Sequence, residues 1–160
     1  MFAQVAKKKA AGVTETVAID GDTNLMWHSE EAILRAAGAV VAAVDGLYAD
    51  PDPTRRLLSA FCAVRPPGHH AERNKACGFC FLNNAGIAAL HAQACYGIER
   101  VAVLDFDVHH GNGTEDGFRD NLTMFYGSTH EKDNFPGEVC HSWYSLLSII
   151  VPTSVYYFAV

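Results

Sequence analysis

Apolar residues recur every three to four positions between residues 29 and 48, which is the spacing of a helix with one buried face. The first is Ile33 and the last is Leu47, and two glutamates occupy the first turn, where negative charge is favoured. Ser29 stands at the start of the segment and is expected to cap it. The pattern predicts a helix over 29–48 that packs on the core.

Three further apolar runs, at residues 58–64, 100–107 and 122–128, have the length of buried strands. A second helical segment runs from Asn83 to about Tyr96, and Gly97 suits the left-handed position that often ends a helix. Strands that alternate with helices are typical of βαβ units. The sequence therefore predicts one α/β domain with a mainly parallel sheet.

Two polar motifs follow these predicted strands, RPPGHHA at residues 65–71 and DFDVHHGNG at residues 105–113. In a parallel sheet, ligand sites form where the carboxyl ends of the strands meet. We therefore expect the histidines of the first motif to lie near the aspartates and histidines of the second.

Alternation along a strand would point Asp105, Asp107 and His109 to one side, while Phe106 and Val108 pack on the other. A carboxylate and an imidazole on one face are two of the three protein ligands usual at a catalytic zinc. The deeper Asp105 would bind a second cation or hold an imidazole through its other nitrogen. The same pattern also suits a strand that enters a loop with capped polar groups.

His69 and His70 are adjacent, so their partners would decide their roles. If one contacts Asp105 and the other contacts Asn112, a carboxylate and a neutral amide would separate their pKa values. The pair would then supply a candidate base and a candidate acid.

Net charge and cysteine content argue against some classes of function for this protein. The net charge is −6, and the only dense basic run is the lysine triplet at 7–9, so an electrostatic grip on nucleic acid is not expected. Five cysteines and no apolar leader favour a reducing cytoplasm over a secreted disulfide scaffold. Cys77 and Cys80 form a single C-x-x-C, which leaves a redox pair open and excludes a four-thiolate zinc site.

The motifs RPPGHHA, GFCFLNN at residues 78–84 and DFDVHHGNGTEDGF at residues 105–118 resemble, in that order and spacing, the histone deacetylase family. Asn112 in HHGNG is similar to the class II and bacterial branch, which includes the acetylpolyamine amidohydrolases. The resemblance covers about residues 20–137 and implies one partial deacetylase-like domain over 1–160. The implied fold is the three-layer arginase/deacetylase-like α/β fold.

The resemblance also implies a zinc-dependent hydrolase that cleaves N-acetyl amides of lysine side chains or polyamines. Asp107 and His109 match zinc ligands, and His69 and His70 match the tandem catalytic histidines. Asp105 matches the residue that supports the first histidine.

Other matched positions concern a second cation and the substrate. Asp105 and Ser128 resemble contributors to a structural potassium site. The residues that resemble the walls and rim of an acyl-lysine tunnel are Gly78, Phe79, Phe135 and, at the rim, Asp22.

Two elements of the family pattern are not found in the sequence. The family's third zinc ligand and its oxyanion tyrosine come far downstream, whereas 51 residues follow His109 here. A truncated, catalytically inactive fragment or pseudoenzyme is therefore the alternative to an active hydrolase.

The tail over residues 138–160 is atypical because it carries no Asp, Glu, Lys or Arg from Val139 onward. Pro152 and several hydroxyl side chains make it a poor membrane span. We expect a premature end, or translation out of frame after about residue 137.

The coding DNA tests this expectation. A shifted frame should restore the deacetylase pattern downstream of residue 137 when the other two frames are translated. If neither frame continues the pattern, the expectation is wrong.

Overall fold

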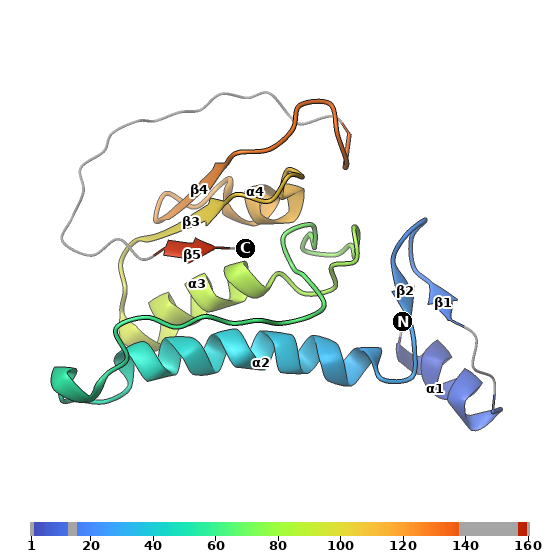
Figure 1. Cartoon of the computed structure of the whole chain (residues 1–160), viewed down its shortest axis with the longest axis horizontal. Coiled ribbons are helices and arrows are strands. Elements are labelled where there is room, and N and C mark those ends of the chain that lie inside the picture. The colour runs from blue at the N-terminus through green and yellow to red at the C-terminus, as the bar shows by residue number, and fades with distance from the viewer. Residues whose placement is uncertain (1, 13–15, 138–156, 160) are drawn as a thin grey trace.

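The computed structural model describes residues 2–12 and 16–137, and the backbone of 157–159. Its helices and strands follow one another along the chain (Figure 1). In order they are α1 (Phe2–Ala10), β1 (Val17–Ala18), β2 (Asn24–Leu25), α2 (Ser29–Tyr48), the 3-10 turn η1 (Pro53–Arg55), α3 (Asn84–Tyr96), β3 (Val101–Asp105), α4 (Asn112–Phe118), β4 (Met124–Ser128) and β5 (Tyr157–Ala159).

The predicted parallel sheet is confirmed. β3 is its central strand, with β4 on one side and β5 on the other, and both pairings are parallel. Val103 pairs with Tyr126, and Asp105 pairs with Ser128 at the carboxyl end of both strands. Figure 1 shows α3 next to the sheet and α2 beyond α3. The described part of the chain is therefore an α/β fold whose sheet and helices lie in successive layers.

The core lies between the sheet and α3. Val101 and Val103 of β3 are buried against Ala85 and Ala89 of α3, together with Phe118 of α4. Alanine side chains let the helix axis approach the strand closely, and burying one valine stabilises the fold by roughly 1.5 to 3 kcal/mol.

Both predicted long helices are present, with one correction at a cap. Asn83 caps α3 by accepting a hydrogen bond from the Gly86 N–H at 2.8 Å, and Gly97 ends the helix at φ 65°. Ser29, however, is the first residue of α2 and not its cap. Its hydroxyl accepts the N–H of Met26 at 2.8 Å, so it stabilises the turn before the helix.

The prediction of a buried strand over residues 58–64 is wrong. This segment is an extended coil that runs alongside α2 (Figure 1). Just before it, the Leu57 N–H is bonded to the Gly46 carbonyl of α2 at 2.9 Å. Leu58 is 99% exposed and Phe61 is 92% exposed, so the apolar run does not enter the core. Apolar content alone misled the prediction, because a strand also needs a neighbouring strand that pairs with it.

The second face of the sheet is less covered. Leu104 of β3 and Phe125 of β4 are exposed, and so are Phe106 and Val108 beyond β3. The expected packing of Phe106 and Val108 is therefore wrong, since β3 ends at Asp105 and the alternation stops there.

Two predictions concern membranes and the tail. Within the described ranges, no helix combines the length and the apolar character that crossing a bilayer requires. The predictions on residues 138–160 lie outside the described residues, apart from the backbone of β5.

A pair of leucine substitutions tests this assignment of core and surface. Leu25 is fully buried between α1 and α2, so Leu25→Ala should lower the free energy of unfolding by about 2 to 5 kcal/mol. Leu58→Ala should change it by less than about 0.5 kcal/mol. Urea unfolding followed by circular dichroism measures both changes. A large loss of unfolding free energy in Leu58→Ala would contradict the exposed position of Leu58 and support a buried strand.

Candidate active site

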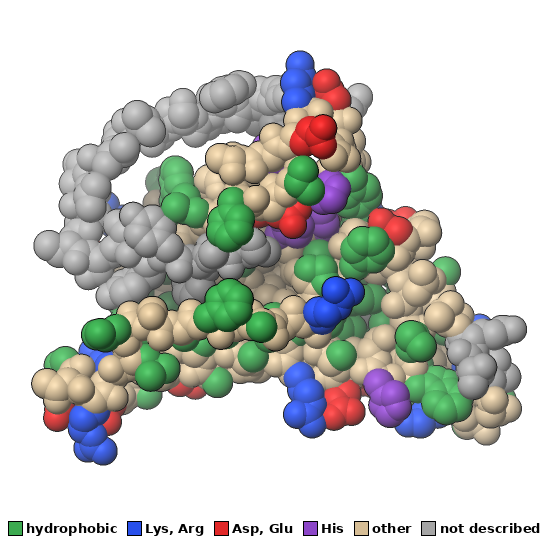
Figure 2. All heavy atoms as spheres, in the orientation of Figure 1, with side chains coloured by type: hydrophobic (Ala, Val, Ile, Leu, Met, Phe, Trp, Pro, Cys, Tyr) green, Lys and Arg blue, Asp and Glu red, His purple; other side chains and the backbone are tan. Residues whose placement is uncertain are grey.

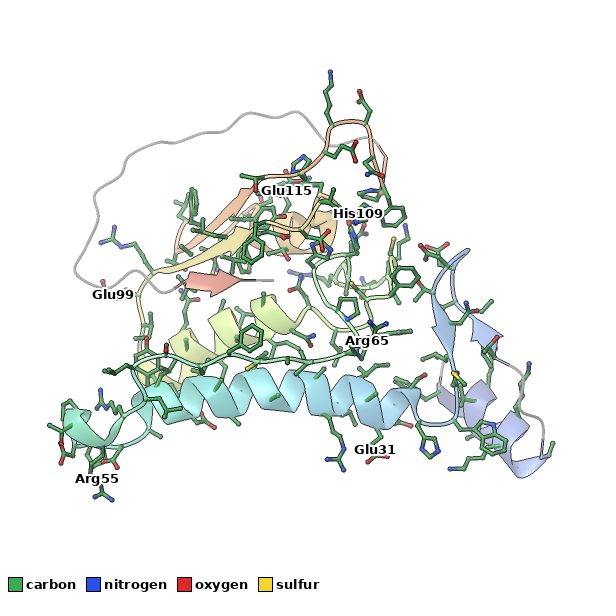
Figure 3. The ribbon with its side chains drawn as sticks, viewed as in Figure 1. Glu31, Arg55, Arg65, Glu99, His109 and Glu115 are labelled. Carbon is green, nitrogen blue, oxygen red and sulfur yellow. The ribbon has the colours of Figure 1, made fainter. Side chains whose placement is uncertain are left out.

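Two loops meet at the carboxyl end of β3. One carries His69 and His70 ahead of α3, and the other runs from Phe106 to Gly111 into α4. Figure 3 shows His109 on this second loop, and Figure 2 shows histidine side chains beside carboxylates in the same region. The expected meeting of the two polar motifs is therefore observed.

His69 is paired with the buried carboxylate of Asp105. Its Nδ1 donates to Asp105 Oδ2 at 2.8 Å, because a carboxylate can only accept. Burial alone raises the pKa of Asp105, but hydrogen bonds from His69, Tyr126 and the Asp107 amide outweigh burial and hold that pKa below its usual range. Asp105 thus stays charged and fixes the tautomer of His69, whose Nε2 lies 4.0 Å from Asp107 Oδ1.

His70 is paired with a neutral amide. Its Nδ1 lies 2.8 Å from Asn112 Oδ1, while Asn112 Nδ2 donates to Glu72 Oε1 at 2.8 Å. The bond to Glu72 orients the amide so that its oxygen accepts from Nδ1–H, which leaves Nε2 of His70 with a lone pair. Burial, partly offset by the bond to Asn112, lowers the pKa of His70. The ring is therefore neutral near pH 7.

Asp107 and His109 bring an oxygen and a nitrogen together. Asp107 Oδ1 lies 3.2 Å from His109 Nδ1, and it also accepts the His109 N–H at 2.8 Å. Two ligands about 2 Å from one tetrahedral zinc stand about 3.3 Å apart, so this donor pair fits zinc. Within the part of the chain that the structure describes, no group of three or more His, Cys, Asp or Glu residues is placed to hold a metal.

Asp107 and His109 are positioned by a loop, whereas the sequence predicted that a strand would position them. β3 ends at Asp105, so Asp107 and His109 lie in a loop and not on a strand. Hydrogen bonds shape that loop, because the Asp105 carboxylate accepts the Asp107 N–H and Asp107 accepts the His109 N–H. The two-residue spacing therefore works through successive turns and not through strand alternation.

One of the two aromatic residues predicted for a tunnel, Phe135, contacts the histidines. The ring of Phe135 meets His70 edge-on, with centroids 4.9 Å apart, and Phe79 is exposed on a left-handed backbone at φ 64°. Gly78 lies between them at φ 54°, where a Cβ would strike the His70 ring and come within 2.8 Å of Phe135. Only glycine lets this loop approach so closely.

Asp22 is linked to the same region by Thr23, a residue that the sequence motifs did not point to. The buried Thr23 hydroxyl donates to Asp22 Oδ1 at 2.8 Å and accepts the Phe79 N–H at 3.0 Å. Thr23 thus ties the loop that carries Asp22 to the loop that carries Phe79.

Ser128 lies at the end of β4, where its hydroxyl is 2.8 Å from His130 Nδ1. The Asp105 carbonyl opposite accepts the Thr129 N–H at 3.0 Å. Neither contact tests a potassium ion, which stays a prediction.

Cys77 and Cys80 pack beside the site as buried free thiols. Their backbones bond to each other in both directions, at 3.1 and 2.9 Å. Burial raises the pKa of the Cys80 thiol to about 12, which disfavours the thiolate that redox exchange requires. A packing role fits these contacts better than the redox alternative.

Sequence reasoning also missed two residues that support the histidines. Tyr126 donates to Asp105 Oδ2 at 2.9 Å and accepts the Gly111 N–H at 3.0 Å, and Glu72 holds Asn112. Tyr126 shares a strand face with Ser128, and that period-two spacing was the available signal. Glu72 follows His70 by two positions but had no signal of its own.

His110, the second histidine of the HHGNG motif, is buried away from the pair at Asp107. Burial lowers its pKa to about 4, so the ring is neutral, and its Nε2 lies 3.2 Å from Glu115 Oε2. Among the described residues, its Nδ1 has no hydrogen-bond partner.

Comparison with known proteins identifies the family of this chain. A family model described as "Histone deacetylase domain" matches residues 2–142. The chain belongs to the histone deacetylase family. Its fold is similar to the "Crystal Structure of HDA15 HD domain", with a TM-score of 0.71 and 37% identity over 83% of this chain and 36% of that one.

Curated relatives, two of them named as histone deacetylases, give the same result. "Histone deacetylase 14, chloroplastic" of Arabidopsis thaliana is 45% identical over 65% of this chain and 25% of its own length. "Histone deacetylase 4" of Caenorhabditis briggsae is 40% identical over 76% of this chain and 14% of its own. An uncharacterized protein of Synechocystis sp. is 43% identical over 74% of this chain and 37% of its own. The chain thus spans less than half the length of these relatives.

Two glycine substitutions test the packing beneath this deacetylase-family site. A Cβ at Gly111 would strike the Asp105 carboxylate and come within 2.6 Å of the Tyr126 hydroxyl. Gly111→Ala should therefore destabilise the protein by about 1 to 3 kcal/mol. Gly117, in the same helical region, has nothing within 4 Å of its Cβ position.

Gly117→Ala is the matched control and should stabilise α4 by up to about 1 kcal/mol. Thermal unfolding compares the two variants. Equal stability of Gly111→Ala and the unmodified protein would contradict the close contact.

Proposed function

We propose that this site is built for zinc-dependent, deacetylase-type hydrolysis of an N-acetyl amide, carried by a lysine side chain or a polyamine. One observation carries the proposal: two differently paired histidines lie beside a carboxylate and an imidazole whose donor atoms are 3.2 Å apart. Amide hydrolysis needs a group that polarises the carbonyl, a base for the attacking water and an acid for the leaving amine.

Asp107 and His109 would hold the zinc, which when bound supplies Lewis acidity toward the amide carbonyl and its attacking water. His70 is neutral, with its Nε2 lone pair free, so it is suited to take the proton of that water. His69 donates its Nδ1–H to Asp105, and its Nε2 points toward Asp107. As an imidazolium that also carries a proton on Nε2, His69 would give that second proton to the leaving amine. The unlike partners of the two rings thus separate their roles.

Substrate binding would use the groups around the histidines. Phe79 and Phe135 would flank the aliphatic part of an acetylated lysine or polyamine, and Gly78 keeps the space between them free of a side chain. Asp22, held by Thr23, would accept hydrogen bonds from the substrate at the rim. Asp105 and Ser128 remain the proposed contributors to a structural potassium site.

The alternative is a catalytically inactive, deacetylase-like fragment. It is favoured for this chain taken alone, because the described residues offer two zinc ligands where three are usual. Loss of a single oxyanion donor alone costs about 10²- to 10³-fold in rate. We therefore expect little or no turnover from the chain by itself, although its site is of the deacetylase type.

Two further predictions stand beside these proposals. Direct nucleic-acid binding is not expected, and Lys7 and Lys9 are exposed as a solvated face would be. A cytoplasmic location stays a prediction, and two relatives carry "chloroplastic" in their names. The oligomeric state is left open.

Zinc binding and turnover, measured on the same protein, separate the two functions. The purified chain is titrated with zinc by calorimetry and then assayed for acetate release from an acetyl-lysine peptide and from N-acetylputrescine. His109→Gln should weaken zinc binding at least about tenfold, whereas His28→Gln, at the exposed N-cap of α2, should leave it unchanged.

Turnover of about 1 to 10³ per second that is lost in His109→Gln would refute the inactive alternative. Zinc binding that depends on His109 without turnover would favour the fragment. Equal zinc binding by the unmodified protein and His109→Gln would overturn the proposed metal site.

A further inference from the structure

A second histidine–carboxylate pair lies outside the candidate active site, where α2 and α3 pack side by side (Figure 1). His91 of α3 places Nε2 only 2.6 Å from Asp45 Oδ1 of α2. Because the carboxylate accepts, Nε2 carries the proton and donates it. The other ring nitrogen, Nδ1, is then left with a lone pair.

That lone pair faces a cysteine. Cys95 lies one helical turn after His91, and its Sγ is 3.4 Å from His91 Nδ1. The thiol is exposed, so a reagent in solution reaches it. A nucleophile next to a base that a third group orients is the usual arrangement of an activated nucleophile.

Tyr96 completes the support of this cluster. Its hydroxyl donates to the same Asp45 oxygen at 2.7 Å, and its ring meets His91 edge-on at 5.8 Å. The hydrogen bond from His91, followed by the one from Tyr96, lowers the pKa of Asp45. The carboxylate therefore stays charged and keeps the His91 proton on Nε2.

No other cysteine in the described ranges has such a neighbour. Cys62 is half-buried, and its Sγ lies 3.7 Å from the Ala39 carbonyl oxygen, which accepts a hydrogen bond and cannot act on the thiol as an imidazole does. Cys77 and Cys80 are buried. Cys62 is thus a natural internal reference for Cys95.

We propose that Cys95 is a modification site for soft carbon electrophiles of the α,β-unsaturated carbonyl class, with His91 as its base and Asp45 as the residue that positions His91. In the reaction, the thiol proton moves to His91 Nδ1 while the sulfur electron pair forms a bond to the β-carbon. The π electrons of the double bond shift toward the carbonyl, and the α-carbon then takes the proton back. The addition has no leaving group and needs no oxidant.

This site is separate from the zinc-ligand pair. Cys95 lies at the end of α3, about 16 Å along the helix axis from Asn84 at its start. The start of α3 is the end tied to the active-site region, since its cap Asn83 donates to Thr114 of α4 at 2.9 Å. The proposal does not depend on zinc or on deacetylase activity.

N-ethylmaleimide, an electrophile of this class, tests the proposal on the whole chain. Peptide-resolved mass spectrometry gives a rate for each cysteine at pH 7. Cys95 should react at least about tenfold faster than Cys62, and His91→Gln should slow Cys95 about tenfold. His28→Gln, which removes an exposed imidazole at the other end of α2 from Asp45, should change the rate less than about twofold.

Two substitutions at Asp45, Asp45→Asn and Asp45→Ala, test whether this residue positions His91. Asp45→Asn keeps an oxygen that accepts from His91 and should give a Cys95 rate between those of the unmodified protein and Asp45→Ala. Unfolding would speed the labelling of Cys62, Cys77 and Cys80, whereas loss of the base slows Cys95 alone.

Two results would overturn the proposal. One is a Cys95 rate no higher than that of Cys62 in the unmodified protein, a comparison that needs no variant. The other is an unchanged Cys95 rate in a folded His91→Gln protein.

Discussion

The buried carboxylate of Asp105 is the group on which the rest of the site depends. A charge taken out of water costs several kcal/mol unless hydrogen bonds replace its hydration. Here three donors do so: the imidazole of His69, the hydroxyl of Tyr126 and the amide of Asp107. Each donor comes from a different segment, so satisfying one charge fixes the loop before α3, the end of β3 and the strand β4 relative to one another.

The contrast between Asp105 and Asn112 shows how one loop gives two adjacent histidines different properties. A charged carboxylate under His69 and a neutral amide under His70 leave the two rings with the same proton position, on Nδ1, but different electrostatic surroundings. The cluster at Asp45 repeats the first of these pairings between two helices. In both places a carboxylate decides which ring nitrogen is available for chemistry.

Much of this arrangement could be predicted from the sequence. The helices over 29–48 and 84–96, the parallel sheet and the meeting of His69 and His70 with Asp105 and Asn112 all follow from periodicity and from the position of polar residues after strands. These features are local, or follow from a general rule of parallel sheets.

The sequence predictions were wrong where tertiary contacts determine the local structure. Apolar residues at 58–64 have no partner strand in the described structure, and Phe106 and Val108 follow a strand that has already ended. The supporting roles of Tyr126, Glu72 and Thr23 depend on contacts between residues distant in sequence, which a single sequence does not encode visibly.

Helix α3 carries a further consequence, for the mutational tolerance of the fold. Its alanines face two ways, with Ala85 and Ala89 against β3, and Ala88 and Ala92 against Val44 of α2. The helix is therefore buried on two sides, and a methylene added on either face would crowd the surface packed against it. Because Asn83 at the start of this helix bonds to Thr114, such a shift would travel to the loops that hold the histidines. Sequence variation in this family member should accordingly be as restricted along these plain alanines as it is at the polar residues of the site.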